Sequence, residues 1–181
     1  AFLNCTTLKK VELPSTLEKI GDNAFDGCTS IAYVSSKNAK SIALGNSAFS
    51  TSINETARLF VPKGSISEYS AWKGYFANIL EGELNVVVDG DMTYYCVAGP
   101  NTATLVEAKT SDAEVTISNE VKYDNVTYIV TEIGDYAFSG ISSLQKVVIG
   151  DSITTIGVGA FRNCSKLKEV VIPAGVNYIG D

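Results

Sequence analysis

The 181-residue sequence contains no histidine and only one tryptophan, one methionine and four prolines. Imidazole is the commonest general base and the commonest zinc ligand, so its absence excludes the usual catalytic triads and most zinc sites. Catalysis would have to depend on carboxylates, lysines or cysteines alone. The sequence therefore predicts a protein that is not an enzyme and that needs no metal and no cofactor.

Positive charge is also scarce, because 14 lysines and arginines stand against 20 acidic residues and give a net charge of −6. A chain of this sign repels phosphate backbones and acidic membrane surfaces. Its longest apolar runs, such as Val86-Val87-Val88, are far shorter than the about 20 residues that span a bilayer. The sequence predicts neither a nucleic-acid partner nor membrane insertion by this fragment.

Four cysteines are too few for the dense disulfide scaffold of a small secreted domain, and none forms a C-x-x-C pair. Cys5, Cys28 and Cys164 occupy one place in a repeated segment, where Ile141 stands in the remaining copy. Replacement by isoleucine indicates a small buried side chain and argues against a metal ligand or nucleophile. We expect free thiols, because parallel side chains in neighbouring copies rarely turn toward each other as a disulfide requires. Cys96 lies outside this repeat.

Internal repetition is what the sequence has in abundance. Four segments share the order A-F-x-x-[CI]-x-x-[LI], paired at a spacing of 23 residues, and they begin at Ala1, Ala24, Ala137 and Ala160. Three of them continue in step into a V-x-[LI] run and then an Ile-Gly pair. A fifth, degenerate copy begins at Ala48-Phe49, and a sixth is hidden around Val115-Thr116-Ile117 and Ile133-Gly134. A register this regular predicts a solenoid.

Each copy predicts one coil. The alternation Leu8…Val11-x-Leu13 is typical of a strand with one buried face, and the proline that follows removes a ladder donor and ends it. A second extended piece leads to Gly21, where we expect a bend that a side chain would hinder. The A-F-x-x-C stretch is too short for an ordinary helix and predicts a single helical or 3₁₀ turn. We expect its phenylalanines to be buried and stacked in register: Phe2, Phe25, Phe138 and Phe161.

The pattern resembles the BspA-like class of leucine-rich repeats, which occurs in surface and secreted proteins of bacteria and of some parasitic protists. The resemblance covers about residues 1–83 and 112–181. It implies a β-rich leucine-rich-repeat solenoid with a parallel sheet and short helical or 3₁₀ turns. Because relatives are associated with adhesion to host matrix proteins and other microbes, it also implies an extracellular or cell-surface location. The implied partners are proteins or glycans, host extracellular matrix among them.

Residues 65–79 predict a short amphipathic helix laid across the end of a solenoid. Ser65 and Glu68 match the S-x-x-E capping box, and apolar side chains follow at helical spacing. A solenoid ends in an open hydrophobic face that needs such a cap. We interpret Trp72 as part of this cap in preference to a ligand anchor. Residues 1–83 are therefore predicted to be the C-terminal end of one array.

From Leu84 onward the repeat gives way to alternating β-rich runs. Turns at Asp89-Gly90-Asp91 and at Asp124-Asn125 predict two hairpins. A calcium loop at the first turn would need further oxygen ligands that the sequence does not supply. Residues 84–136 are thus predicted to be the β-hairpin N-terminal cap of a second array, with its first repeats at 137–181. Both chain ends fall inside a repeat, so we expect a fragment of a longer protein.

Alternation of side chains along a strand also predicts a binding face. Since the apolar members point inward, their neighbours point outward and form rows across the coils, with Tyr33 beside Lys10 and Val148 beside Val171. The candidate partner-binding residues are Lys10, Glu12, Tyr33, Lys146, Val148, Glu169 and Val171. Solenoids bind partners through such extended surfaces. We predict an adhesin-like module that binds macromolecules; the alternative is a structural spacer or stalk that displays another domain.

Overall fold

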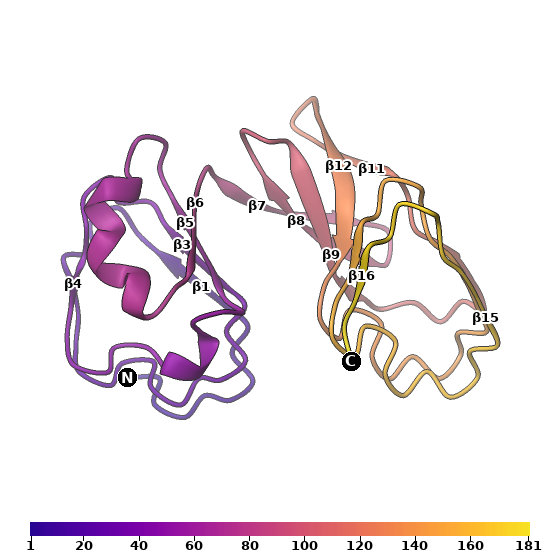
Figure 1. Cartoon of the computed structure of the whole chain (residues 1–181), viewed down its shortest axis with the longest axis horizontal. Coiled ribbons are helices and arrows are strands. Elements are labelled where there is room, and N and C mark those ends of the chain that lie inside the picture. Colours follow the sequence, from indigo (N-terminus) through magenta and orange to yellow (C-terminus); the bar gives the residue numbers. More distant parts are fainter. The chain divides into compact units, whose positions relative to one another are not determined.

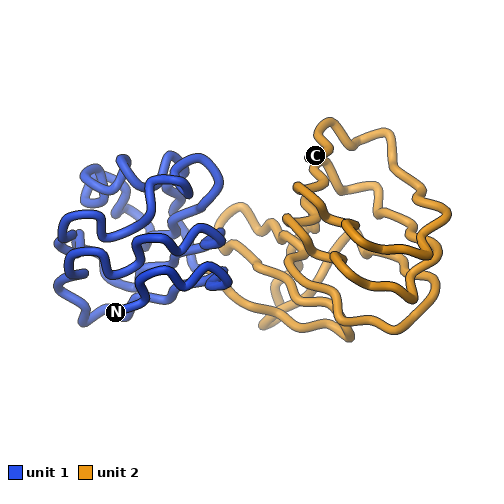
Figure 2. The backbone as a smooth tube through the Cα atoms, turned by 90° about the horizontal axis from the view of Figure 1, so that it is seen from below, with its two compact units in different colours: residues 1–83 blue, residues 84–181 orange.

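The computed structural model describes all 181 residues, which divide into two compact units at residues 1–83 and 84–181 (Figure 2). Both are built from stacked coils of extended chain, as the repeat predicts (Figure 1).

Unit 1 has two parallel sheets, one on each side of its coils. Its elements are β1 (Lys10–Leu13), β2 (Lys19–Ile20), β3 (Tyr33–Ser36), β4 (Ala43–Leu44), the 3₁₀ helix η1 (Thr51–Ile53), β5 (Arg58–Val61), the 3₁₀ helix η2 (Ile66–Gly74) and β6 (Asn78–Glu81). The larger sheet has the order β1-β3-β5-β6, and β2 pairs with β4. Val11 lies opposite Val34, one repeat later, so the predicted register is confirmed.

Unit 2 begins with antiparallel strands and continues with coils built on the same plan. Its strands are β7 (Leu84–Asp89), β8 (Met92–Val97), β9 (Thr102–Ala108), β10 (Glu114–Thr116), β11 (Glu120–Tyr123), β12 (Val126–Ile133), β13 (Lys146–Val148), β14 (Thr155–Ile156), β15 (Glu169–Val171) and β16 (Tyr178–Ile179). Strands β10, β13 and β15 form one parallel sheet. The other sheet has the order β16-β14-β12-β9-β8-β7, and β11 pairs with β12.

The hidden copy and both predicted hairpins are confirmed. Val115 pairs with Val147, and Ile133 pairs with Ile156, in parallel register. Antiparallel pairing joins β7 to β8 and β11 to β12. Asp124 and its neighbour both have positive φ angles, 48° and 60°, as a type I′ turn requires.

Phenylalanine rings stack from coil to coil, but the outermost ones are not buried. Phe2 lies 5.0 Å from Phe25, and Phe138 lies 5.1 Å from Phe161, between ring centroids. Phe25 and Phe138 are buried, whereas Phe2 is 50% exposed and Phe161 is half-buried. The expectation of burial was therefore wrong for these two, because no further coil in this chain covers their outer faces.

The A-F-x-x-C segment forms a single tight turn in each coil. The N–H of Cys28 donates to the carbonyl of Phe25 over 3.2 Å, and Cys164 makes the same bond to Phe161. The residue before the cysteine has positive φ, 71° at Gly27. Glycine or asparagine stands at this place in all four copies, because these residue types tolerate this conformation.

Glycine in the Ile-Gly pair is needed for close contact between coils. A Cβ atom on Gly45 would lie 2.3 Å from Asp22 Oδ1 and 2.5 Å from its backbone nitrogen, both in the preceding coil. On Gly21, in the first coil of this structure, a Cβ atom would meet nothing within 4 Å. The predicted bend is therefore only part of the reason for this glycine.

The predicted short helix at the end of unit 1 is confirmed, and it is the 3₁₀ helix η2, the larger coiled ribbon in Figure 1. Ser65 makes no side-chain capping bond, so the capping-box prediction was wrong. Its backbone has φ −106° and ψ 0°, whereas an N-cap residue needs an extended conformation. The structural interpretation of Trp72 is confirmed, because it is fully buried and its Nε1 donates to the carbonyl of Ile42 over 3.1 Å.

All four cysteines are free thiols. Cys28, Cys96 and Cys164 are buried, and burial raises the pKa of each thiol, that of Cys96 to about 11. Cys5 is exposed, contrary to the expectation of burial. It belongs to the first coil, where no preceding coil covers the cysteine side chain.

Candidate partner-binding surface

The outward face of β10, β13 and β15 carries a row of three charged side chains. Lys146 lies between Glu114 and Glu169 in the parallel register. Its Nζ atom is 2.8 Å from a carboxylate oxygen of Glu169. The pKa of Lys146 is raised, first by this hydrogen bond and then by the charges of Glu169 and Glu114. The predicted pairing of Lys146 with Glu169 is confirmed, while Glu114 was missed because its copy of the repeat is degenerate.

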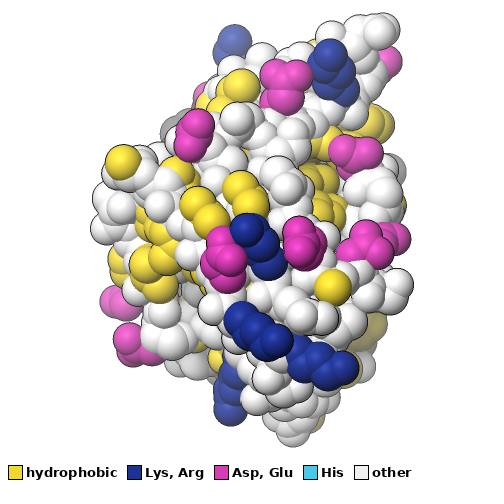
Figure 3. All heavy atoms as spheres, turned by 90° about the vertical axis from the view of Figure 1, so that its right-hand side faces the viewer, with side chains coloured by type: hydrophobic (Ala, Val, Ile, Leu, Met, Phe, Trp, Pro, Cys, Tyr) yellow, Lys and Arg dark blue, Asp and Glu magenta, His cyan; other side chains and the backbone are white.

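A second row on the same face is mostly apolar. Thr116, Val148 and Val171 lie side by side, and Val171 is 44% exposed while Val148 is half-buried. Figure 3 views this side of the molecule and shows charged side chains of both signs next to hydrophobic ones. The face therefore carries a mostly apolar row next to a charged row.

On unit 1, the predicted rows form but differ in exposure. Lys10 pairs in register with Tyr33, as expected. Glu12 is exposed and accepts a hydrogen bond from Lys10. This bond lowers the pKa of Glu12, and the charges of Lys10 and Lys37 add to the effect. Lys10 and Glu12 can therefore offer only a paired charge to a partner.

Tyr33 is buried, with 8% of its surface exposed, so the prediction that it is an exposed anchor was wrong. Its ring lies nearly parallel to that of Phe60, with centroids 6.4 Å apart. Ser35, opposite Phe60 in the register, is buried as well. Alternation gives the direction of a side chain, but its exposure depends on what neighbouring strands carry. The segment Arg58-Leu59-Phe60-Val61-Pro62 has the sequence pattern of the other strands. Its Phe60 was the sequence signal for the burial of Tyr33.

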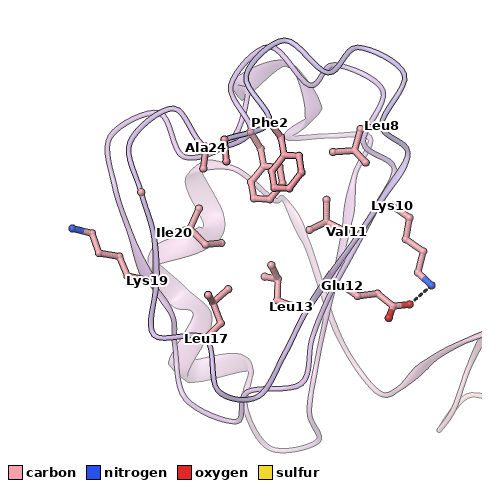
Figure 4. A pocket seen from close by; sticks show the side chains of 13 residues that line it. Phe2, Leu8, Lys10, Val11, Glu12, Leu13, Leu17, Lys19, Ile20 and Ala24 are labelled. Atoms are coloured by element: carbon pink, nitrogen blue, oxygen red, sulfur yellow. Dashed lines mark hydrogen bonds and ion pairs between the residues drawn. The ribbon is translucent and has the colours of Figure 1, made fainter.

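An apolar cavity of about 520 Å³ opens at the start of unit 1 (Figure 4). Phe2, Leu8 and Leu17 surround it, and Ile20 points into it. It is the inside of the first coil, with Lys10 and Glu12 at its outer side. Its apolar side chains supply hydrophobic contact, and the charged groups of Lys10 and Glu12 point away from it.

No three histidine, cysteine, aspartate or glutamate side chains lie together as a metal-binding group. Neither short helix has the length and apolar character of a membrane-spanning helix.

The family described as "BspA type Leucine rich repeat region" matches residues 1–74 and 114–181 in six copies. No curated protein matches the chain. A solved leucine-rich repeat protein from Bacteroides capillosus is 30% identical over 52% of this chain and 70% of its own length, with a TM-score of 0.49. A leucine-rich cell surface protein from Faecalibacterium prausnitzii is 18% identical over 97% of this chain and 44% of its own, with a TM-score of 0.45. For the pneumococcal vaccine antigen PcpA the identity is 18%, the coverage 94% and 40%, and the TM-score 0.41.

Proposed function

Because this chain belongs to the BspA-type leucine-rich repeat family, we propose that it is a non-enzymatic module that binds other macromolecules through the outward face of its strands. The apolar row of half-buried Val148 and exposed Val171, beside the charged row of Lys146 and Glu169, is the observation that carries the proposal. Interfaces combine an apolar centre with a polar rim in this way. Lys10 and Glu12 form a smaller charged part of the face on unit 1.

The proposed partner is a protein or glycan outside the cell, with host extracellular matrix as the first class to test. We assign the module to the cell surface or the extracellular space, the setting in which this family occurs. An adhesin-like role follows from that location together with an exposed binding face. The face lacks unpaired lysines and arginines along its charged row, which supports a partner other than nucleic acid.

We also propose that the two units belong to two arrays. Unit 1 has the features of a C-terminal end, because η2 and the residues that follow it cover the last coil with three buried aromatic rings: Tyr69 and Trp72 of η2, and Phe76. Unit 2 has the features of a beginning, because the antiparallel strands β7 and β8 precede the parallel pairing of β9 with β12. Separate expression of residues 1–83 and 84–181 tests this, since each should unfold cooperatively by itself.

The binding proposal is tested on a panel of immobilised matrix proteins and glycans. The variant Val148→Lys/Val171→Lys places two charges in the apolar row and should abolish capture by any partner of the unchanged chain. The control Val158→Lys alters another exposed valine of unit 2 outside this face and should bind normally. Capture that survives in the double variant would refute the assigned face.

The spacer alternative gains from one observation, the burial of Tyr33, which removes the aromatic anchor expected on unit 1. A spacer should bind nothing on the panel.

A further inference from the structure

Two backbone hydrogen bonds join each Ile-Gly corner to the next coil. The carbonyl of Ile20 accepts from the N–H of Gly45 over 2.8 Å, and the N–H of Asn23 donates to the carbonyl of Asn46 over 2.9 Å. Unit 2 has the same two bonds at two of its junctions: Gly157 to Ile133 and Tyr136 to Val158, then Gly180 to Ile156 and Gly159 to Asp181. Each such coil thus has a free carbonyl and, three residues later, a free N–H. A Gly-X pair of the next coil bonds to both, with the glycine N–H as donor and the carbonyl of X as acceptor.

Leu44 and Ser47 hold these two places in the second coil of unit 1, but no Gly-X pair follows them. After β5 the chain turns into η2. The carbonyl of Leu44 and the N–H of Ser47 make no hydrogen bond within the chain. The N–H of Leu44 also points outward, because the flanking residues Ala43 and Gly45 donate to the first coil. The cap satisfies only the neighbouring carbonyl, that of Ile42, through Trp72.

These unpaired groups line a groove of about 480 Å³ between β4 and η2. That volume lies within the range of about 300–1,000 Å³ for ligand sites. Asn46, Ala71 and Tyr75 complete its walls, and no charged side chain lines it. The Tyr75 ring is fixed against Phe49, with centroids 6.0 Å apart, and is half-buried.

We propose that this groove binds an extended Gly-X segment of a partner polypeptide. The glycine N–H donates to the carbonyl of Leu44, and the carbonyl of X accepts from the N–H of Ser47. The amide of X donates to Asn46 Oδ1, since Asp22 Oδ1 holds the equivalent N–H of the next coil over 2.8 Å. The peptide adds an extended strand to the exposed edge of β4, a mode of recognition common to many peptide-binding domains. This site is separate from the strand face proposed above.

Glycine is specified by the close approach of the chains. At the equivalent places, a Cβ atom on Gly45 would lie 2.3 Å from Asp22, one on Gly157 would lie 2.5 Å from Asp135, and one on Gly180 would lie 2.6 Å from Val158. The side chain of X is not specified, since the equivalent residues Asn46, Val158 and Asp181 are all exposed. The carbonyl of Leu44 and the N–H of Ser47 require a ligand that supplies a backbone N–H and a backbone C=O in this order. This requirement disfavours an oligosaccharide.

The test is an NMR titration of the ¹⁵N-labelled chain with the blocked peptide Thr-Thr-Ile-Gly-Val-Gly, the sequence of residues 154–159. Saturable shifts are expected at the amides of Leu44, Asn46 and Ser47. A peptide with alanine in place of the first glycine should bind at least about tenfold more weakly, a difference that the titration resolves. Equal affinity of the two peptides, or shifts that follow an oligosaccharide and not the peptide, would overturn the proposal.

Ala71→Arg places a long side chain in the groove from an exposed position on η2 and should abolish the shifts. Ser70→Arg is the matched control, since Ser70 is exposed on the same helix but does not line the groove. The spectrum of each variant without peptide reports whether it is folded. Binding that persists in folded Ala71→Arg contradicts this site. The Val148→Lys/Val171→Lys variant should bind the peptide normally. The proposal for the groove and the proposal for the strand face are therefore tested independently.

Discussion

The thiol of Cys164 donates a hydrogen bond to the carbonyl oxygen of Phe138, 3.1 Å away in the preceding coil. Cys28 makes the same bond to Phe2 over 2.9 Å. The cysteine position of the repeat therefore links neighbouring coils through a polar contact as well as filling space. Each of these two thiols donates to a backbone carbonyl of the preceding coil, and neither cysteine is in a disulfide.

Thiol accessibility should differ between the first coil and the rest of the protein. At pH 8 a disulfide reagent should modify Cys5 rapidly in the folded chain, because it is exposed. Cys28, Cys96 and Cys164 should react only after unfolding, since burial hides them and raises their pKa values. Mass spectrometry of the modified peptides identifies the sites. Rapid labelling of Cys164 in the native state, or a Cys5–Cys28 disulfide, would contradict the thiol arrangement.

Stability should fall at alkaline pH because of Cys96. Burial raises its pKa from an ordinary value near 9 to about 11, so the folded state holds this proton more tightly than the unfolded chain does. The stabilisation is complete below pH 9 and is lost as the pH rises through 11, a loss of about 2–3 kcal/mol. Tyr94, with a pKa raised to about 12 chiefly by burial, adds a further loss above pH 10.

Denaturant unfolding between pH 7 and 11 measures this dependence. Cys96→Ala should lower stability at neutral pH but flatten the decline between pH 9 and 11. Cys5→Ala should keep the slope of the unchanged protein, because Cys5 is exposed. An unchanged slope in Cys96→Ala would show that another group is responsible.

Stacked phenylalanines should contribute unequally to stability. Phe138 is fully buried between its neighbours, so Phe138→Ala should cost about 3–5 kcal/mol of unfolding free energy. Phe161 stacks on it but is half-buried in the last coil, so Phe161→Ala should cost about 1–2 kcal/mol, in proportion to the smaller area removed from water. Chemical denaturation of both variants makes the comparison. Equal losses would mean that the last coil is covered in solution.

The coils of this fold could be predicted from the sequence because the same pattern of apolar residues and glycine recurs in several copies. Val11 opposite Val34 follows directly from a spacing of 23 residues. Ser65 shows where this reasoning stops, since its motif matched a capping box but its backbone conformation is set by the turn from Pro62. Local motifs predict local structure only when distant contacts leave the backbone free to adopt it.

The candidate face was predicted with the same strengths and limits. Lys146, Val148, Glu169 and Val171 lie in the expected rows because strand alternation and coil register fix their positions. Tyr33 lies in its expected row but is buried, since Phe60, from the next coil, packs beside it. The groove at Leu44 could not be predicted at all. The groove exists because the third coil departs from the repeat and forms η2. The sequence feature connected with it is the absence of a Gly-X pair in that coil.

Two glycines at the same place in the repeat should respond oppositely to substitution by alanine. Gly45→Ala would put a Cβ atom within 2.5 Å of two atoms of Asp22, one of them a backbone nitrogen that cannot move aside alone. Separation of the coils at this point should cost about 1–3 kcal/mol. Gly21→Ala meets nothing within 4 Å and should be neutral or stabilise by about 0.4–1 kcal/mol, because alanine restricts the unfolded chain.

Both glycines lie in unit 1, so denaturant unfolding of that unit compares them under the same conditions. A bend alone would make the two substitutions equally harmful, whereas close stacking makes only Gly45→Ala harmful. Equal effects would therefore refute the explanation of this glycine by coil contact. They would also remove the reason for expecting glycine in the peptide at the Leu44 groove, because that selectivity depends on the same approach of one coil to the next.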